Sequence, residues 1–145
     1  MVWIRRLFWI AGIYGLLVVT PQYFLESRIS QDQPRVVRGS PDPAREPTPG
    51  LPHPEYFYGF IGVVLVWQLV YITIGTDPQR YRPIILLAAL AKFSFFATSA
   101  VLFTLGRIPA VICYFAGIDF VLGMLFVIAF VQVGRLEKAV ASDRR

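Results

Sequence analysis

Residues 83–133 read PIILLAALAKFSFFATSAVLFTLGRIPAVICYFAGIDFVLGMLFVIAFVQV, and this stretch decides the fold. It contains two apolar runs, 83–105 and 109–133, separated only by Gly106, Arg107 and Ile108. At ~1.5 Å per helical residue, each run is long enough to cross a bilayer core of ~30 Å. Because the connection is so short, the two helices must be antiparallel neighbours. The stretch therefore predicts a transmembrane helical hairpin.

Two more apolar runs, 7–25 and 56–74, precede this hairpin in a chain of 145 residues that is 56% hydrophobic. The apolar residues form continuous blocks, which is typical of membrane spans and not of a soluble core. The run 7–25 is longer than the ~7–15 apolar residues of a signal peptide, and no small-residue cleavage site follows it. We therefore predict an all-α fold, a four-helix transmembrane bundle that forms a single integral membrane domain over residues 1–145.

The basic residues predict the orientation of this bundle. Eight lie on one side of the predicted spans and five on the other. The eight are Arg5, Arg6, Arg80, Arg82, Arg135, Lys138, Arg144 and Arg145, and the five are Arg28, Arg35, Arg38, Arg45 and Arg107. Because cytoplasmic flanks carry the excess of Lys and Arg, we expect both termini in the cytoplasm. The proline-rich loop 27–53 is then expected outside, as a solvated spacer or a segment for an outside partner.

The charge and cysteine content exclude several classes of function. The net charge of +5 comes mostly from basic residues beside span ends, which indicates membrane topology and not nucleic-acid binding. The single cysteine, Cys113, cannot form an internal disulfide, and no metal-ligand spacing surrounds it. The sequence thus predicts no metal, no cofactor and no nucleic-acid partner, and it predicts the lipid bilayer as the principal surroundings of the chain.

Small residues mark the faces on which membrane helices approach closely. Each predicted span has such a face. Its members are Ala11 and Gly15 in span 7–25, Gly59 and Gly62 in span 56–74, Ala88, Ala91, Ser94, Thr98 and Ser99 in span 83–105, and Ala116 and Gly123 in span 109–133. This distribution favours a packed bundle over four separate anchors.

Two charged residues interrupt the apolar runs of the hairpin, Lys92 and Asp119. A charge near the bilayer centre costs at least ~2.5–3.5 kcal/mol, so both side chains should face the bundle interior. Lys92 lies nine residues after Pro83, ~13–14 Å from one boundary, and Asp119 lies ten residues after Pro109, ~15 Å from the other. The two side chains therefore reach similar depths on neighbouring helices. Each leans toward the start of its own helix, so Lys92 must bend to meet Asp119.

Three interpretations fit these two charges. Lys92 and Asp119 form a structural ion pair between the last two spans; or Lys92 extends to the headgroups while Asp119 is neutral or bonded to a hydroxyl; or the two form a working site for protons, ions or a polar ligand. Further polar side chains are available to this candidate intramembrane polar site: Gln68 first, then Tyr71, Ser94 and Ser99.

A second, weaker candidate lies at the predicted outer surface, where His53 and Glu55 could act as acid and base. A helix start accounts for the same residues, because Pro54 suits a first helical position and Glu55 suits the first turn. No phosphate-binding loop, Ser-His-Asp order or zinc spacing occurs in the sequence. We therefore predict no catalytic residue and disfavour an enzyme.

Seven segments together resemble a family of small bacterial four-span membrane proteins of hypothetical function. They are Ala11–Gly15, Pro21–Glu26, His53–Gly62, Trp67–Gln68, Asp77–Pro83, Lys92–Phe95 and Asp119–Gly123. The layout is also similar, more loosely, to DoxX-like four-helix proteins. The resemblance implies the four-span fold and a location in a bacterial inner membrane, and it implies no activity because the family has none assigned.

The sequence therefore favours a multi-pass membrane protein without enzymatic activity of its own. Such a protein would act as a subunit or accessory factor, beside a membrane protein partner or a second copy of the chain. The alternative is a small carrier or proton-coupled transporter that uses Lys92 and Asp119.

Overall fold

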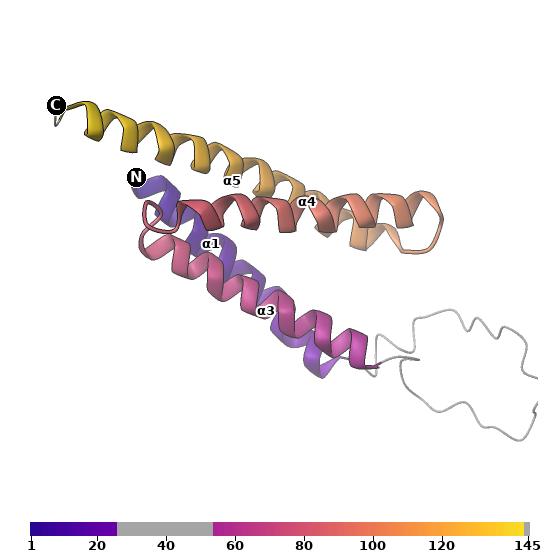
Figure 1. Ribbon diagram of the computed structural model, residues 1–145. Coiled ribbons are helices and arrows are strands. Elements are labelled where there is room, and N and C mark those ends of the chain that lie inside the picture. The colour runs from indigo at the N-terminus through magenta and orange to yellow at the C-terminus, as the bar shows by residue number, and fades with distance from the viewer. Residues whose placement is uncertain (26–53, 144–145) are drawn as a thin grey trace, which may run out of the picture.

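The computed structural model describes residues 1–25 and 54–143, and all secondary structure in this part of the chain is helical (Figure 1). The helices are α1 (Val2–Val19), continued by the 3₁₀-helix η1 (Thr20–Phe24), then α3 (Pro54–Thr76), α4 (Arg82–Thr104) and α5 (Ala110–Asp143). Four segments, α1 with η1, α3, α4 and most of α5, are long and apolar enough to cross a membrane. The predicted all-α fold with four such helices is confirmed. The predicted loop 27–53 lies outside the described residues.

Both terminal helices are longer than the apolar runs that predicted them. Helix α1 begins at Val2 and not at residue 7, and α5 continues ten residues beyond Val133. Helix formation needs no apolar side chain, and residues 135–139 are Arg, Leu, Glu, Lys and Ala, which are all strong helix formers. At the other end of α1 the coil tightens into η1, where Pro21 lacks the N–H that an α-helical bond requires.

The four helices form two hairpins. Helix α1 packs along α3, and α4 packs along α5, whereas α3 and α4 touch each other only slightly. Figure 1 shows the hairpins side by side at the end that holds both chain termini, and apart at the opposite end. We call these the closed end and the open end. Gly106, at φ 66°, allows the tight turn between α4 and α5 at the open end.

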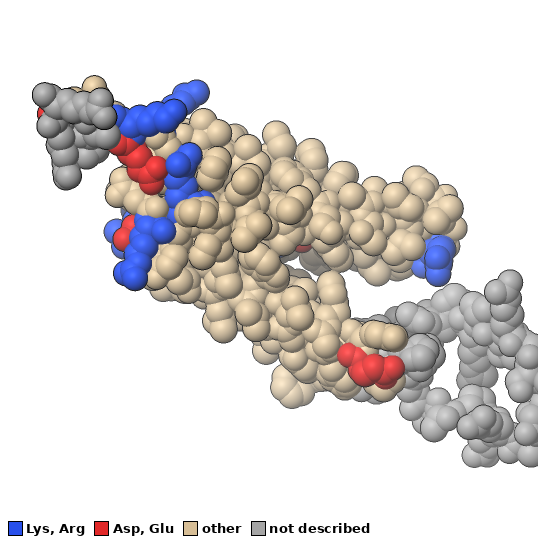
Figure 2. All heavy atoms as spheres, viewed as in Figure 1, with Lys and Arg blue, Asp and Glu red and all other residues tan. Residues whose placement is uncertain are grey.

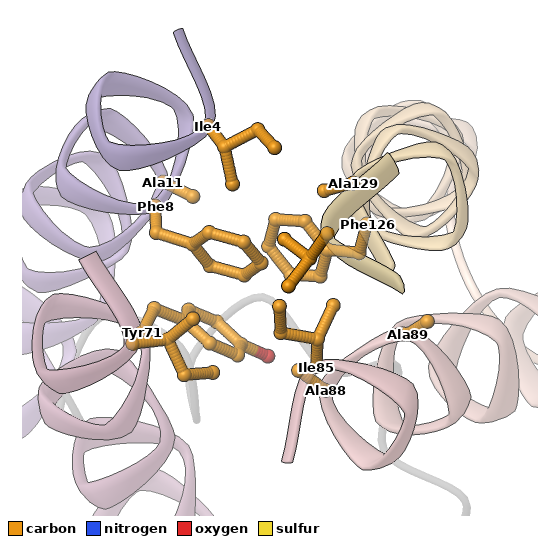
Figure 3. Packing of buried hydrophobic residues seen from close by; sticks show 11 residues of the cluster. Ile4, Phe8, Ala11, Tyr71, Ile85, Ala88, Ala89, Phe126 and Ala129 are labelled. Carbon is orange, nitrogen blue, oxygen red and sulfur yellow. The ribbon is translucent and has the colours of Figure 1, made fainter. Parts of the chain in front are cut away.

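The hydrophobic core joins the two hairpins near the closed end. All four helices contribute to it, and Phe8 of α1 stacks on Phe126 of α5 with ring centroids 4.4 Å apart (Figure 3). Tyr71 of α3 meets the same Phe126 ring edge-on at 5.2 Å, and Ile85 of α4 is fully buried beside them. These aromatic contacts hold the hairpins together where they converge.

Close approach within each hairpin depends on glycine. Gly12 and Gly15 of α1 lie so close to α3 that an added Cβ atom would overlap with it, and Gly123 of α5 lies equally close to the Phe93 ring of α4. These contacts are the ones that small residues permit between membrane helices. Gly59 is different, because it is exposed with open space beside it. The prediction that Gly59 marks a helix contact is therefore wrong.

The surface of the described residues suits a bilayer. Figure 2 shows a broad uncharged middle, with Lys and Arg gathered mainly at the closed end. Large apolar side chains such as Leu17, Val66, Leu90 and Val121 are more than half exposed along the helices. Every backbone hydrogen bond of a long helix is made within the helix, so these surfaces need no water.

Candidate functional site

An ion pair between Lys92 of α4 and Asp119 of α5 lies at mid-length of the second hairpin. The Lys92 ammonium donates a hydrogen bond to Asp119 Oδ1 across 2.6 Å. The two side chains are only 11% and 20% exposed, so the pair is largely removed from the surface of the bundle. The antiparallel hairpin brings both residues to one depth. Each side chain tilts toward the N-terminus of its own helix, so the flexible lysine side chain bends to reach Asp119.

The other hairpin presents tyrosines to this ion pair. The Lys92 Nζ lies 5.4 Å from the centroid of the Tyr71 ring, within the range of a cation–π interaction. Tyr14 of α1 and Tyr71 of α3 both lie within electrostatic range of the Asp119 carboxylate. The pair therefore belongs to the second hairpin but faces both helices of the first.

Sequence reasoning missed Tyr14, and the packing of α1 against α5 explains its place. Trp3 Nε1 donates a hydrogen bond to Gln132 Oε1 at 3.1 Å, and the Phe8–Phe126 stack follows in the same antiparallel register. Extending that register by about two helical turns brings Tyr14 opposite Asp119. The only signal in the sequence was a tyrosine in the middle of an apolar run, and it does not say which helix lies opposite.

Gln68, the third residue of the predicted polar site, points elsewhere. It is 2% exposed, and its Nε2 donates to the Val64 carbonyl of its own helix at 2.9 Å. Its Oε1 has no N–H or O–H donor within the described residues. An added Cβ on Gly15 would overlap with this oxygen, so the end of the Gln68 side chain packs directly against Gly15 of α1. Gln68 thus serves the contact between α1 and α3.

The remaining predicted residues do not join the ion pair through any hydrogen bond found in the described part of the chain. Ser99 is buried two turns further along α4, and Ser94 is exposed. Glu55 is exposed in the first turn of α3, at the open end, where the prediction of a helix start placed it. His53 lies outside the described residues, so the predicted pairing of His53 with Glu55 stays a prediction.

The position of the ion pair determines what it can do chemically. It carries no net charge, it lies next to the core on the side of the open end, and the Asp119 side chain is more exposed than the Lys92 side chain. In surroundings of low dielectric, removal of either charge alone destabilises the contact between the two helices, because the remaining charge is left buried without a partner.

Comparison with known proteins adds no identity: no family model, no curated protein and no solved structure matches this chain. The four long apolar helices are consistent with a four-span membrane protein. The resemblance to one particular bacterial family stays a prediction.

Proposed function

We propose that this chain is a multi-pass integral membrane protein that acts as a non-enzymatic subunit or accessory factor. The observation that carries this proposal is the ion pair between Lys92 Nζ and Asp119 Oδ1, which lie 2.6 Å apart. These are the two charges found mid-span among the described residues, and each serves as the partner of the other. A pair so placed stabilises helix assembly. The Tyr71 ring beside Lys92 extends the same support to the first hairpin.

The proposed orientation places both termini in the cytoplasm of a bacterial inner membrane. The basic residues gathered at the closed end support it (Figure 2), because cytoplasmic flanks are rich in Lys and Arg. The partner of the proposed subunit is a second membrane protein or a second copy of this chain. The divergence of the hairpins supports this part of the proposal, since it leaves the helices at the open end with little contact between hairpins.

Purification of the tagged chain from its native membranes in a mild detergent tests this function. We expect a second membrane protein, or a defined oligomer of the chain, to co-purify in fixed proportion. The double variant Lys92→Met with Asp119→Leu should keep the partner if it keeps the fold, since the pair serves assembly of the chain itself. Repeated recovery of a lone monomer with no bound partner would argue against a subunit role.

A second candidate function is a small proton-coupled carrier, favoured by one specific observation. The Asp119 side chain is one-fifth exposed and lies beyond the core on the side of the open end, which supports access by a proton or a polar molecule. Reconstitution in proteoliposomes tests this candidate. A carrier should lose its pH-dependent flux on Asp119→Asn and keep it on Ser94→Ala, an exposed position on the neighbouring α4. Flux that survives Asp119→Asn would rule out the carrier.

A further inference from the structure

A pocket of about 420 Å³ lies at the closed end, between the start of α4 and the last third of α5. Its lining residues are Gln79, Arg82, Pro83, Leu86, Phe130 and Glu137. This volume is within the range of small-molecule sites, ~300–1,000 Å³. The pocket is far from the Lys92–Asp119 pair, and the proposed function does not use it.

The lining changes from charged to apolar with depth. Arg82 begins α4 at the boundary of the span, and Leu86 lies one turn, ~6 Å, further toward the membrane centre. On the antiparallel α5, Phe130 lies seven residues, ~10 Å, deeper than Glu137. Leu86 is 49% exposed on the outside of the bundle, so the apolar half of the pocket opens toward lipid. A molecule that fits has a polar head at the membrane surface and an apolar body below it.

Arg82 and Glu137 set the charge that the head must have. Arg82 Nη1 donates to Glu137 Oε2 at 3.1 Å, and Arg82 Nε points to the Phe130 carbonyl oxygen at 3.4 Å, while the guanidinium stacks over the Phe130 ring at 4.4 Å. These contacts fix the guanidinium but occupy only part of its five N–H donors. Both side chains remain about one-third exposed, at 32% and 38%. One fixed positive group and one negative group are therefore presented side by side.

We propose that this pocket binds a phospholipid with a zwitterionic, primary-ammonium headgroup, of the phosphatidylethanolamine class. The phosphate accepts hydrogen bonds from the free N–H groups of Arg82, and the lipid ammonium donates to Glu137. Charges then alternate in sign around the group, so neither protein charge loses its partner. An acyl chain follows Leu86 and Phe130 into the bilayer. A purely anionic headgroup could also bind Arg82 through its phosphate, but it would offer no N–H donor and no positive charge to the Glu137 carboxylate beside it.

Native mass spectrometry of the full chain in mild detergent tests this proposal without any mutation. Lipids of equal acyl composition are compared: phosphatidylethanolamine, its mono-, di- and trimethylated forms, and phosphatidylglycerol. Affinity should fall as methyl groups replace N–H donors, by about tenfold between the primary amine and the trimethylated form, which is the size expected when a charge-assisted hydrogen bond is lost. Equal affinity across the methyl series, or tighter binding of phosphatidylglycerol, would overturn the proposal.

Variants and a soluble headgroup complete the test. Arg82→Gln should weaken phosphatidylethanolamine binding about tenfold, and Glu137→Gln should remove the preference for the primary amine. Arg80→Gln is the matched control, since Arg80 does not line the pocket and lies over the neighbouring Tyr81 ring. Glycerophosphoethanolamine, which lacks acyl chains, should bind at least a hundredfold more weakly than the lipid. Equal effects of Arg80→Gln and Arg82→Gln, or equal binding of the soluble headgroup, would refute a lipid site here.

Discussion

The Lys92–Asp119 ion pair yields the sharpest prediction about stability. Asp119→Asn removes the partner of an ammonium that is 11% exposed, and Lys92→Met strands a carboxylate that is 20% exposed. Breaking a buried pair in this way costs ~3–5 kcal/mol, and insertion scales assign ~2.5–3.5 kcal/mol to a lone charge at mid-membrane. Partial exposure and the flexible lysine stem lower these costs, so we expect each single change to reduce the free energy of unfolding by about 2–3 kcal/mol.

The double variant Lys92→Met with Asp119→Asn leaves no stranded charge. It should lose only about 1 kcal/mol relative to the original chain, which makes the coupling energy between the two sites about 3–5 kcal/mol. Equilibrium unfolding in mixed micelles measures all four proteins, and Trp3, Trp9 and Trp67 supply the fluorescence signal. If the two single losses simply add in the double variant, the reasoning from an ion pair is refuted.

Three further predictions use the same unfolding assay. Gly15→Ala should lower the free energy of unfolding by about 1–3 kcal/mol, because the added Cβ would overlap with Gln68. The control Gly117→Ala has open space beside it and should not lower the free energy of unfolding. Equal effects of the two changes would contradict the α1–α3 contact. Phe126→Ala should lose several times more stability than Phe103→Ala, since Phe126 is fully buried and Phe103 is 44% exposed, and similar losses would argue against the core that joins the hairpins. Gln68→Met should reduce the free energy of unfolding by no more than about 1 kcal/mol, because Oε1 has no hydrogen-bond donor among the described residues. A loss above about 2 kcal/mol would show an unrecognised partner of Gln68.

Much of the fold could be predicted because a bilayer imposes a simple length requirement. Blocks of about twenty apolar residues identify the spans whatever their neighbours are. The ends of the helices were less predictable, since α5 continues beyond the apolar run through residues 134–143, half of which are charged or carry a hydroxyl. In that segment helix propensity decides the structure, and hydropathy does not.

The pairing of the helices into hairpins could not be predicted beyond α4 with α5. Each span is apolar on all sides, so no hydrophobic stripe indicates which face meets a neighbour. Small residues gave an incomplete guide: Gly15 lies in the α1–α3 contact, while Gly59 of α3 lies against open space. The divergence of the hairpins is a property of the packing of whole helices and has no local sequence signal.

The candidate polar site was partly predictable for a geometric reason. Counting residues from Pro83 and Pro109 placed Lys92 and Asp119 at one depth, because helix rise converts position in the chain directly into depth. The same counting could not assign Gln68, whose direction depends on the rotation of α3 about its axis. Tyr14 was out of reach as well, because it meets Asp119 only through the contact of α1 with α5.

The side of the membrane on which each end of the chain lies is the strongest test of a bundle of four membrane-spanning helices. Reporters of compartment, such as cysteines labelled by an impermeant reagent in a variant without Cys113, would be placed at the N-terminus, at the C-terminus and in residues 27–53. Four crossings predict that both termini lie on one face and residues 27–53 on the opposite face, and the proposed orientation makes the face of the termini the cytoplasmic one. Termini on opposite faces, or a chain that fractionates free of membranes, would contradict the account.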